Sequence, residues 1–125
     1  MEILVPISLG ELYDKISILE IKRTMITDEK KLVNINKELE VLNLISDKHP
    51  FDNDLYLKIK KINKDLWIVE DQLRVKEKNR DFDEAFISLA RSVYYHNDER
   101  ARIKREINNE YNSSIIEEKS YEKYD

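Results

Sequence analysis

The sequence predicts an all-α fold of four long amphipathic helices, packed as antiparallel hairpins in a helical bundle and forming one domain over residues 1–125. Three observations lead to this prediction. The chain contains one glycine and two prolines, whereas a strand-rich fold needs many tight turns built from such residues. Apolar residues recur at helical steps of three and four. Each of these periodic stretches follows a side chain suited to cap a helix N-terminus.

The chain begins with a short segment, residues 2–7, that is rich in β-branched residues. Its proline disfavours helical geometry in the residue before it, so we expect an extended segment, at most a lone strand. Ser8 and Glu11 then match a capping box, in which the serine caps an amide and the glutamate reaches back. They predict a first helix that runs to about residue 26, and Gly10 in its first turn indicates close packing there.

The second and third helices are predicted from caps and apolar spacing. Asp28 marks the start of the second helix, which ends near Asp47 because Pro50 cannot continue a helix. Asp52 marks the start of a third helix of about 28 residues, or about 42 Å. The third helix has the clearest heptad spacing in the chain, a pattern typical of coiled coils, at Leu55, Ile59, Ile62, Leu66, Val69, Leu73 and Lys76.

After a short connection, Asp81 and Glu84 match a second capping box and predict a fourth helix that runs to about Tyr111. Short connections place successive helices antiparallel, so we expect two helical hairpins. The last residues are mixed in character, and we expect residues 115–125 to form a frayed tail.

Composition argues against several classes of protein. Charged residues make up 38% of the chain and the net charge is −4, which argues against nucleic acid as a partner. No apolar stretch approaches the roughly 20 residues of a membrane-spanning helix, so no membrane association is expected. The chain has no cysteine, which excludes thiolate chemistry and fits a reducing compartment. Together with the lack of a signal-peptide pattern, this predicts a cytoplasmic protein.

The predicted fourth helix has one apolar stripe, formed by Phe82, Phe86, Leu89, Val93, Ile107 and Tyr111. Groups that carry charge or form hydrogen bonds interrupt this stripe for about two turns; they are His96, Asn97, Arg100 and Lys104. Two charged residues project from the apolar face of the first helix in the same way, Glu20 and Arg23. Because a buried charge must be paired, we expect Glu20 to meet Arg100 and all six residues to form a buried polar layer.

Three interpretations of this layer are open. It can be a structural ion-pair layer that fixes the register of the helices, which we favour because such networks are a known use of core polar residues. It can be a pocket for a small anionic ligand, since the arginine fork suits a phosphate or a carboxylate. It can also be solvated, if the end of the helix splays.

Four basic residues fall within six positions near the end of the predicted fourth helix: Arg100, Arg102, Lys104 and Arg105. Acidic residues lie beside them, so we expect a salt-bridged, exposed helix face rather than an anion or nucleic-acid patch. Acidic pairs elsewhere, among them Glu11 and Asp14, are expected by chance in a chain with so much charge.

No pattern of metal ligands or cofactor binding is apparent. The two histidines, His49 and His96, belong to no Glu-x-x-His motif, so the di-metal site of some helical bundles is not predicted. A chain with one glycine has no glycine-rich phosphate loop. We therefore expect neither a metal nor a cofactor.

The opening stretch reads ILVPISLGELYDKISILEIK over residues 3–22, and later segments read ARSVY over 90–94, KREIN over 104–108 and EEKSY over 117–121. Together they resemble a family of small bacterial helical proteins known as a domain of unknown function. The resemblance covers nearly the whole chain. It implies a stand-alone helical protein in a sugar-related gene context, and it supplies no catalytic residues.

Two functional hypotheses follow. The first is a non-enzymatic interaction module, which forms a homo-oligomer or binds a helical protein partner. It is supported by a first helix that is apolar on two sides, a long heptad helix, and the lack of a recognisable catalytic constellation. The alternative is a binder of, or an enzyme acting on, a small anionic compound around Arg100. That compound would carry a phosphate or a carboxylate, and sugar-related compounds with such a group are among the candidates.

Overall fold

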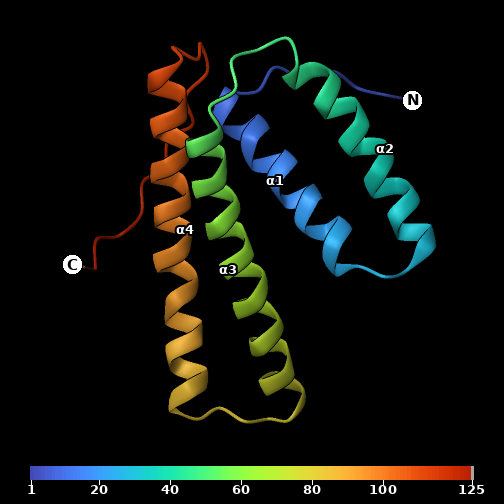
Figure 1. The fold of residues 1–125 in the computed structure, drawn as a ribbon. Coiled ribbons are helices and arrows are strands. Elements are labelled where there is room, and N and C mark those ends of the chain that lie inside the picture. Colours follow the sequence, from blue (N-terminus) through green and yellow to red (C-terminus); the bar gives the residue numbers. More distant parts are fainter. Residues whose placement is uncertain (125) are drawn as a thin grey trace.

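The computed structural model describes residues 1–124 and consists of four helices: α1 (Leu9–Met25), α2 (Glu29–Ser46), α3 (Asn53–Lys78) and α4 (Glu84–Glu110). Figure 1 shows them as two hairpins, α1–α2 and α3–α4. Residues 1–124 contain no strand, so the prediction of an all-α fold is confirmed, and residues 2–7 are extended without pairing. No helix among these residues is long and apolar enough to cross a membrane.

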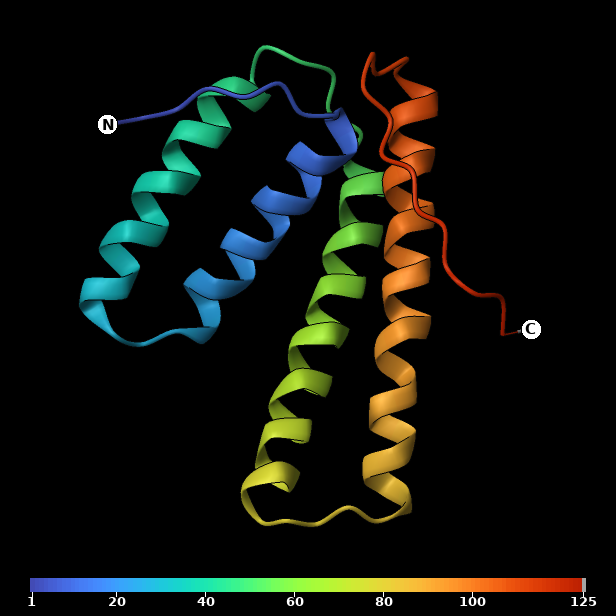
Figure 2. The same cartoon turned by 180° about the vertical axis from the view of Figure 1, so that it is seen from behind.

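Helix α1 joins the two hairpins, because it packs against each of the other three helices. This agrees with the apolar residues predicted on two of its sides. The hairpins lie close at one end and diverge toward the other, where α3 and α4 continue well beyond the end of α1 (Figures 1 and 2). The molecule therefore has a thick end of four helices and a thin end of two.

Helix starts follow the predicted caps in three of four cases. Ser8 accepts a hydrogen bond from the Glu11 amide at 3.1 Å, and the side chains of Asp28 and Asp52 cap α2 and α3 in the same way. The reciprocal half of the first capping box does not form. The Glu11 carboxylate instead binds Lys104, as described below.

The predicted cap of the fourth helix at Asp81 is wrong, because Asp83 caps α4 and accepts a hydrogen bond from the Phe86 amide at 2.9 Å. The end of α3 explains the shift. Arg80 has a positive φ of 52°, and the Asp81 amide still donates to the Lys76 carbonyl at 2.9 Å. Asp81 thus belongs to the C-terminal cap of α3 and cannot start the next helix.

The hydrophobic core lies at the thick end. It is formed by side chains from all four helices: Leu12, Tyr13, Ile16, Leu19, Ile35, Leu39, Leu55, Tyr56, Ile59, Ile103 and Ile107. From α4 it takes residues near the C-terminus only, and no residue of 84–102 is buried. The predicted apolar stripe of α4 is therefore buried over a short part of its length, and Phe82 lies outside the helix with 52% of its surface exposed.

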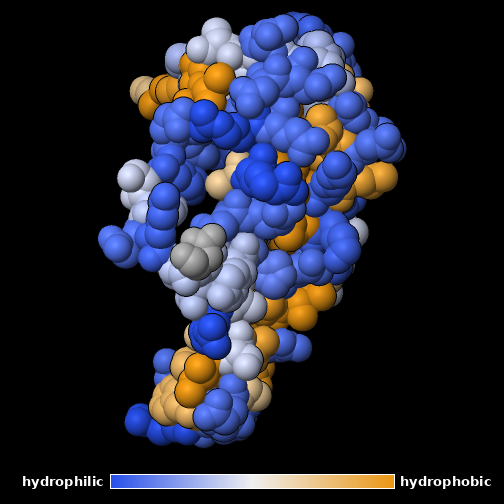
Figure 3. Space-filling model, turned by 90° about the vertical axis from the view of Figure 1, so that its left-hand side faces the viewer, coloured by the Kyte–Doolittle hydropathy of each residue, from blue (hydrophilic) through white to orange (hydrophobic). Residues whose placement is uncertain are grey.

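The projecting part of the α3–α4 hairpin, residues 70–93, is called the arm below. None of its residues is buried. Hydrophobic residues gather at its end, at the bottom of the space-filling view in Figure 3. The arm is a pair of helices without a third layer.

Residues 112–124, called the tail below, leave the end of α4 and run back along it without forming a helix (Figures 1 and 2). Asn112 has a positive φ of 52°, which reverses the chain direction. Of the segment expected to fray, residues 115–124 lie along α4, and residue 125 lies outside the described residues.

Candidate functional site

A polar face of α1 packs against α3 and α4. Gly10, Asp14 and Ser17 are spaced four and three residues apart, so they lie on one side of the helix. All three are buried. A Cβ atom on Gly10 would lie 2.5 Å from the Lys104 carbonyl oxygen, and the Gly10 amide donates to Asn108 Oδ1 at 2.7 Å. Glycine therefore lets α1 and α4 approach closely, as predicted.

The centre of this contact is an ion pair between Asp14 and Arg100. Arg100 Nε donates to Asp14 Oδ1 at 2.9 Å and Nη2 donates to Oδ2 at 2.5 Å, a two-pronged geometry that is stronger than a single bond. Asn63 of α3 donates to Asp14 Oδ1 and to Ser17 Oγ, both at 2.8 Å. The Asp14 side chain is 2% exposed and that of Arg100 is 29% exposed, so the pair reaches from the interior to the surface.

Lys104 forms the second charged centre, with its side chain 7% exposed. Its ammonium donates to Glu11 Oε2 at 2.7 Å and to Glu117 Oε1 at 3.0 Å, and it lies 3.9 Å from Asp14 Oδ2. Lys104 therefore ties together α1, α4 and the tail.

Both cations stay charged near neutral pH. The hydrogen bond with Asp14 raises the pKa of Arg100 above its usual value and outweighs the effect of burial. Burial alone would lower the pKa of Lys104, but hydrogen bonds to Glu11 and Glu117 together raise it above its usual value. We call these five charged residues, together with Ser17, Asn63 and Asn108, the polar layer. Its three carboxylates outnumber its two cations, so it has no spare positive charge.

The predicted pair between Glu20 and Arg100 is wrong. Glu20 accepts a hydrogen bond from the Tyr56 hydroxyl and one from Lys60 at 3.4 Å, and both donors belong to α3. Helix α1 crosses the α3–α4 pair diagonally, with its start on α4 and its end on α3. Arg100 therefore meets Asp14, nearly two turns before Glu20.

The other predicted residues are divided between the layer and its surroundings. Asn97 lies beside Arg100, with its Oδ1 at 3.4 Å from Arg100 Nη1. Arg23 is half exposed and lies 3.9 Å from Glu20, outside the layer. His96 Nδ1 lies 2.7 Å from the Ser92 carbonyl of its own helix. The structure thus brings Asn97, Arg100 and Lys104 together and separates them from the other three.

The carboxylates of the layer do not stand out in the sequence, because Glu11 and Asp14 look like one of the acidic pairs expected by chance in a chain that is 38% charged. The pattern that could have found Asp14 is its position between Gly10 and Ser17 on a helix that is otherwise apolar on that side. Small and polar residues at helical spacing mark a close helix contact that supplies hydrogen bonds. Glu117 carries no comparable pattern, since it approaches Lys104 through the fold of the tail.

The expectation of a salt-bridged, exposed basic run on α4 is confirmed for Arg102 and Arg105 and is wrong on exposure for Arg100 and Lys104, which are paired but largely covered. Arg102 pairs with Glu99 and lies 3.9 Å from Glu106, while Arg105 donates to Glu118 at 2.8 Å. Arg100 and Lys104 are paired inside the polar layer. Among residues 1–124, no buried side-chain nitrogen or oxygen lacks a hydrogen-bond partner, and no group of three potential metal ligands occurs.

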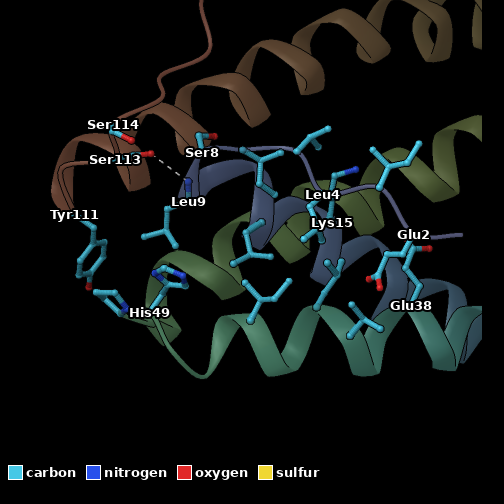
Figure 4. Close-up of a pocket in the computed structure, with 18 of the residues that line it drawn as sticks. Glu2, Leu4, Ser8, Leu9, Lys15, Glu38, His49, Tyr111, Ser113 and Ser114 are labelled. Atoms are coloured by element: carbon cyan, nitrogen blue, oxygen red, sulfur yellow. Dashed lines mark hydrogen bonds between the residues drawn. The ribbon is translucent and has the colours of Figure 1, made fainter.

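Two sizeable hollows open on the surface of the described residues. One, of about 540 Å³, lies between the N-terminal segment, α1 and α2. Figure 4 shows aliphatic side chains such as Leu9 pointing into it, with Glu2, Lys15 and Glu38 among its polar neighbours. It is an apolar groove with a polar edge.

The second hollow, of about 530 Å³, begins where α1 leaves the α3–α4 pair; we call it the cleft. Ile18, Trp67, Asn97 and Arg100 line it, together with α3 residues of the arm. It joins the polar layer to the arm and exposes the outer edge of Arg100.

Comparison with protein families identifies the family of this chain. A family of unknown function, DUF6165, matches residues 3–124, and the chain belongs to this family. No curated protein and no solved structure matches the chain. The membership confirms the family resemblance of the opening stretch and assigns no activity to the polar layer.

Proposed function

We propose that this protein is a non-enzymatic association module that pairs with a second copy of itself through the arm. The observation that carries the proposal is that no side chain of residues 70–93 is buried. Four apolar side chains of the arm are only partly buried: Leu73, Phe86, Leu89 and Val93. Two helices alone give one contact line, whereas a stable domain packs at least two layers around a core.

The surface of the arm is unusual for this chain. Val75, Phe82 and Ile87 are roughly half exposed, and residues 85–95 contain a single charged residue, Arg91, in a chain that is 38% charged. Exposed apolar surface of this kind marks sites of protein association. Each large apolar side chain that becomes fully buried contributes about 1.5–3 kcal/mol.

The position of helix α1 supports the proposal. Helix α1 lies across α3 and α4 at the level of Asn63 and Arg100, where its Asp14 contacts both. Beyond that level α3 and α4 continue without a helix laid across them (Figure 1), and the cleft lies where α1 ends its cover. A helix of a second copy laid on the arm would continue the layer that α1 begins.

Two arms complete each other when they pair groove to groove and antiparallel, as a four-helix bundle. In a parallel pairing the two α1 helices would lie at the same end of the dimer and would overlap. The antiparallel two-fold sets α4 against α4, with Phe86 of one copy near Val93 of the other and Ala90 near the axis. On α3 it sets Arg74 of one copy near Asp71 of the other, so opposite charges meet.

The size of the arm limits the strength of pairing. The α4 part of the arm, residues 84–93, is about 15 Å long, and two helices are about 20 Å wide. The contact is then about 300 Å² per copy, less than half of the roughly 800 Å² of a standard interface. We therefore expect a dimer with a dissociation constant in the micromolar range.

The alternative function, binding of a small anion around Arg100, has less support. Arg100 and Lys104 are each held by carboxylates of the chain itself, so an added anion would meet positive charge that is already neutralised. No catalytic activity is proposed. The cytoplasmic location expected from the sequence goes with this proposal, and cell fractionation would test it.

Sedimentation velocity tests the proposal across protein concentrations from about 5 to 500 µM, the range set by the expected affinity. Val93→Glu should keep the chain monomeric throughout, with helix content unchanged by circular dichroism, because Val93 is not buried within one copy. Ser88→Glu is the matched control: it adds the same charge to the arm about 200° round α4 from Phe86, and it should dimerise like the wild type. A wild-type chain that stays monomeric over the whole range contradicts the proposal.

A further inference from the structure

The tail is held to α4 at three separate points. At its start, the Ser113 amide donates to the Asn108 carbonyl at 2.8 Å. The Ser113 hydroxyl accepts from the Leu9 amide at 3.3 Å and donates to the Ile115 carbonyl at 2.8 Å. These bonds fix where the tail leaves the helix bundle and in which direction it runs.

The middle of the tail is held by charge. Glu117 accepts from Lys104 at 3.0 Å, and Glu118 accepts from Arg105 at 2.8 Å. The two cations differ in kind: Lys104 is 7% exposed and fixed by α1, while Arg105 is 50% exposed. Two adjacent glutamates thus each bind one cation, of which one is buried and the other exposed.

The end of the tail is held by aromatic rings. The Tyr124 hydroxyl donates to the Asp98 carboxylate. Its ring centroid lies 5.1 Å from that of Tyr94 and 5.1 Å from that of Tyr95. Edge-to-face contacts of this kind add to the area that an aromatic ring buries.

Between these points the tail stands away from α4. Within the described chain, no backbone–backbone hydrogen bond involves residues 114–124. A hollow of about 230 Å³ lies between the tail and α4, lined by Ala101, Lys104, Arg105 and Asn108 among others; the tail side of the molecule faces the viewer in Figure 3. Beyond Ser113, the tail is therefore held by its side chains.

We propose that the face of α4 formed by Asp98, Ala101, Lys104, Arg105 and Asn108 is a docking site for extended acidic protein segments, and that the tail is its resident occupant. The segment it takes has two adjacent glutamates followed six residues later by a tyrosine, the spacing of Glu118 and Tyr124. The face itself is built by α1 and α4, because Glu11 and Asp14 hold Lys104 from the other side. This site is separate from the groove of the arm and does not rest on self-association.

Because the tail is tethered to the chain, it limits the access of other acidic segments to this face of α4. A segment joined by a short linker acts at a millimolar effective concentration, while exposed ion pairs such as Arg105–Glu118 are individually weak. A second acidic segment therefore competes with the tail, and releasing the tail should strengthen binding of that segment by about tenfold.

The test uses the full chain carrying Glu117→Lys and Glu118→Lys, which repels the tail from Lys104 and Arg105. A fluorescent peptide with the sequence of residues 112–124 is titrated with this chain and with the wild type, and binding is followed by anisotropy. We expect the peptide to bind the released chain about tenfold more tightly than the wild type. Binding should weaken as salt is raised, because the contacts at Arg105 are exposed.

Two controls make the test specific. A peptide with Glu117→Gln and Glu118→Gln should lose binding to the released chain. Adding Arg105→Glu to that chain should also abolish binding, and a peptide with Glu118→Arg should restore it. If the charge-reversed chain does not fold, as judged by circular dichroism, Glu117→Gln with Glu118→Gln in the chain serves instead. Equal binding of the acidic and neutral peptides, or no binding to a folded released chain, overturns the proposal.

Discussion

Replacing Asp14 with alanine tests whether the polar layer holds the two hairpins together. The change removes the acceptor of two hydrogen bonds from Arg100 and one from Asn63. It also removes a carboxylate that lies 3.9 Å from Lys104. The remaining charges stay in place, so Arg100 loses its partner while most of its side chain stays covered.

The expected loss of stability follows from burial. Removing one partner of a buried ion pair costs about 3–5 kcal/mol. Arg100 is 29% exposed and can recover part of its solvation, so we expect the lower end, about 3 kcal/mol. The unfolding entropy of a chain of 125 residues is about 0.26 kcal/mol per degree, so the melting temperature should fall by about 11 °C.

Urea unfolding followed by circular dichroism measures this loss directly. A double-mutant cycle with Arg100→Ala isolates the pair, and the two substitutions together should cost at least about 1.5 kcal/mol less than the sum of each alone. A loss below about 0.5 kcal/mol for Asp14→Ala would be that of an ordinary surface change. It would refute the view that this ion pair supports the fold.

Two further predictions concern the same contact. Gly10→Ala should destabilise the fold by about 1–3 kcal/mol in urea despite the helix preference of alanine, because the new Cβ would lie 2.5 Å from the Lys104 carbonyl oxygen; a more stable variant would mean that the helices can separate there without cost. Because the pKa of Lys104 is raised on folding, its contribution to stability is complete below its unfolded pKa of about 10.5 and is lost as pH rises through the folded value. The free energy of unfolding should therefore fall more steeply above pH 10.5 in the wild type than in Lys104→Met. The raised pKa values of Tyr13 and Tyr111 also lower stability at high pH, and they do so in the wild type and in Lys104→Met alike. Equal slopes of unfolding free energy against pH in the two proteins would therefore contradict the role given to Lys104.

The helices could be predicted because their signals are local. Ser8, Asp28 and Asp52 each accept from an amide two or three residues ahead, so the cap and the helix start appear together in the sequence. The fourth cap was misplaced by two residues. Both Asp81 and Asp83 suit a cap, and the choice depends on how α3 ends around Arg80.

The polar layer could be predicted in part. Helical periodicity places Arg100 and Lys104 on the apolar side of α4, and they do face α1. It says nothing about the level at which α1 crosses α4, and that level decides between Glu20 and Asp14 as the partner of Arg100. The close approach at Gly10 sets the crossing, and it depends on contacts about 100 residues apart in the chain.

The arm and the tail show a second limit of periodicity. Phe86, Leu89 and Val93 follow the helical spacing of a core as closely as Ile107 does, yet they are not buried. Spacing shows which side chains share a face and leaves open whether the same chain covers that face. The contact of Glu117 with Lys104 likewise depends on the turn at Asn112, which carries no helical pattern.

Pairing of the arm with a second copy in antiparallel register can be tested by cross-linking. The chain has no cysteine, so Ala90→Cys introduces a single thiol near the proposed two-fold axis, where two copies can approach within disulfide distance. Under mild oxidation at concentrations above the dissociation constant, Ala90→Cys should give a covalent dimer as the main product, while Ser88→Cys, on the other side of α4, should remain mostly monomeric. Equal cross-linking of the two variants, or none in either, would contradict antiparallel pairing of the arm.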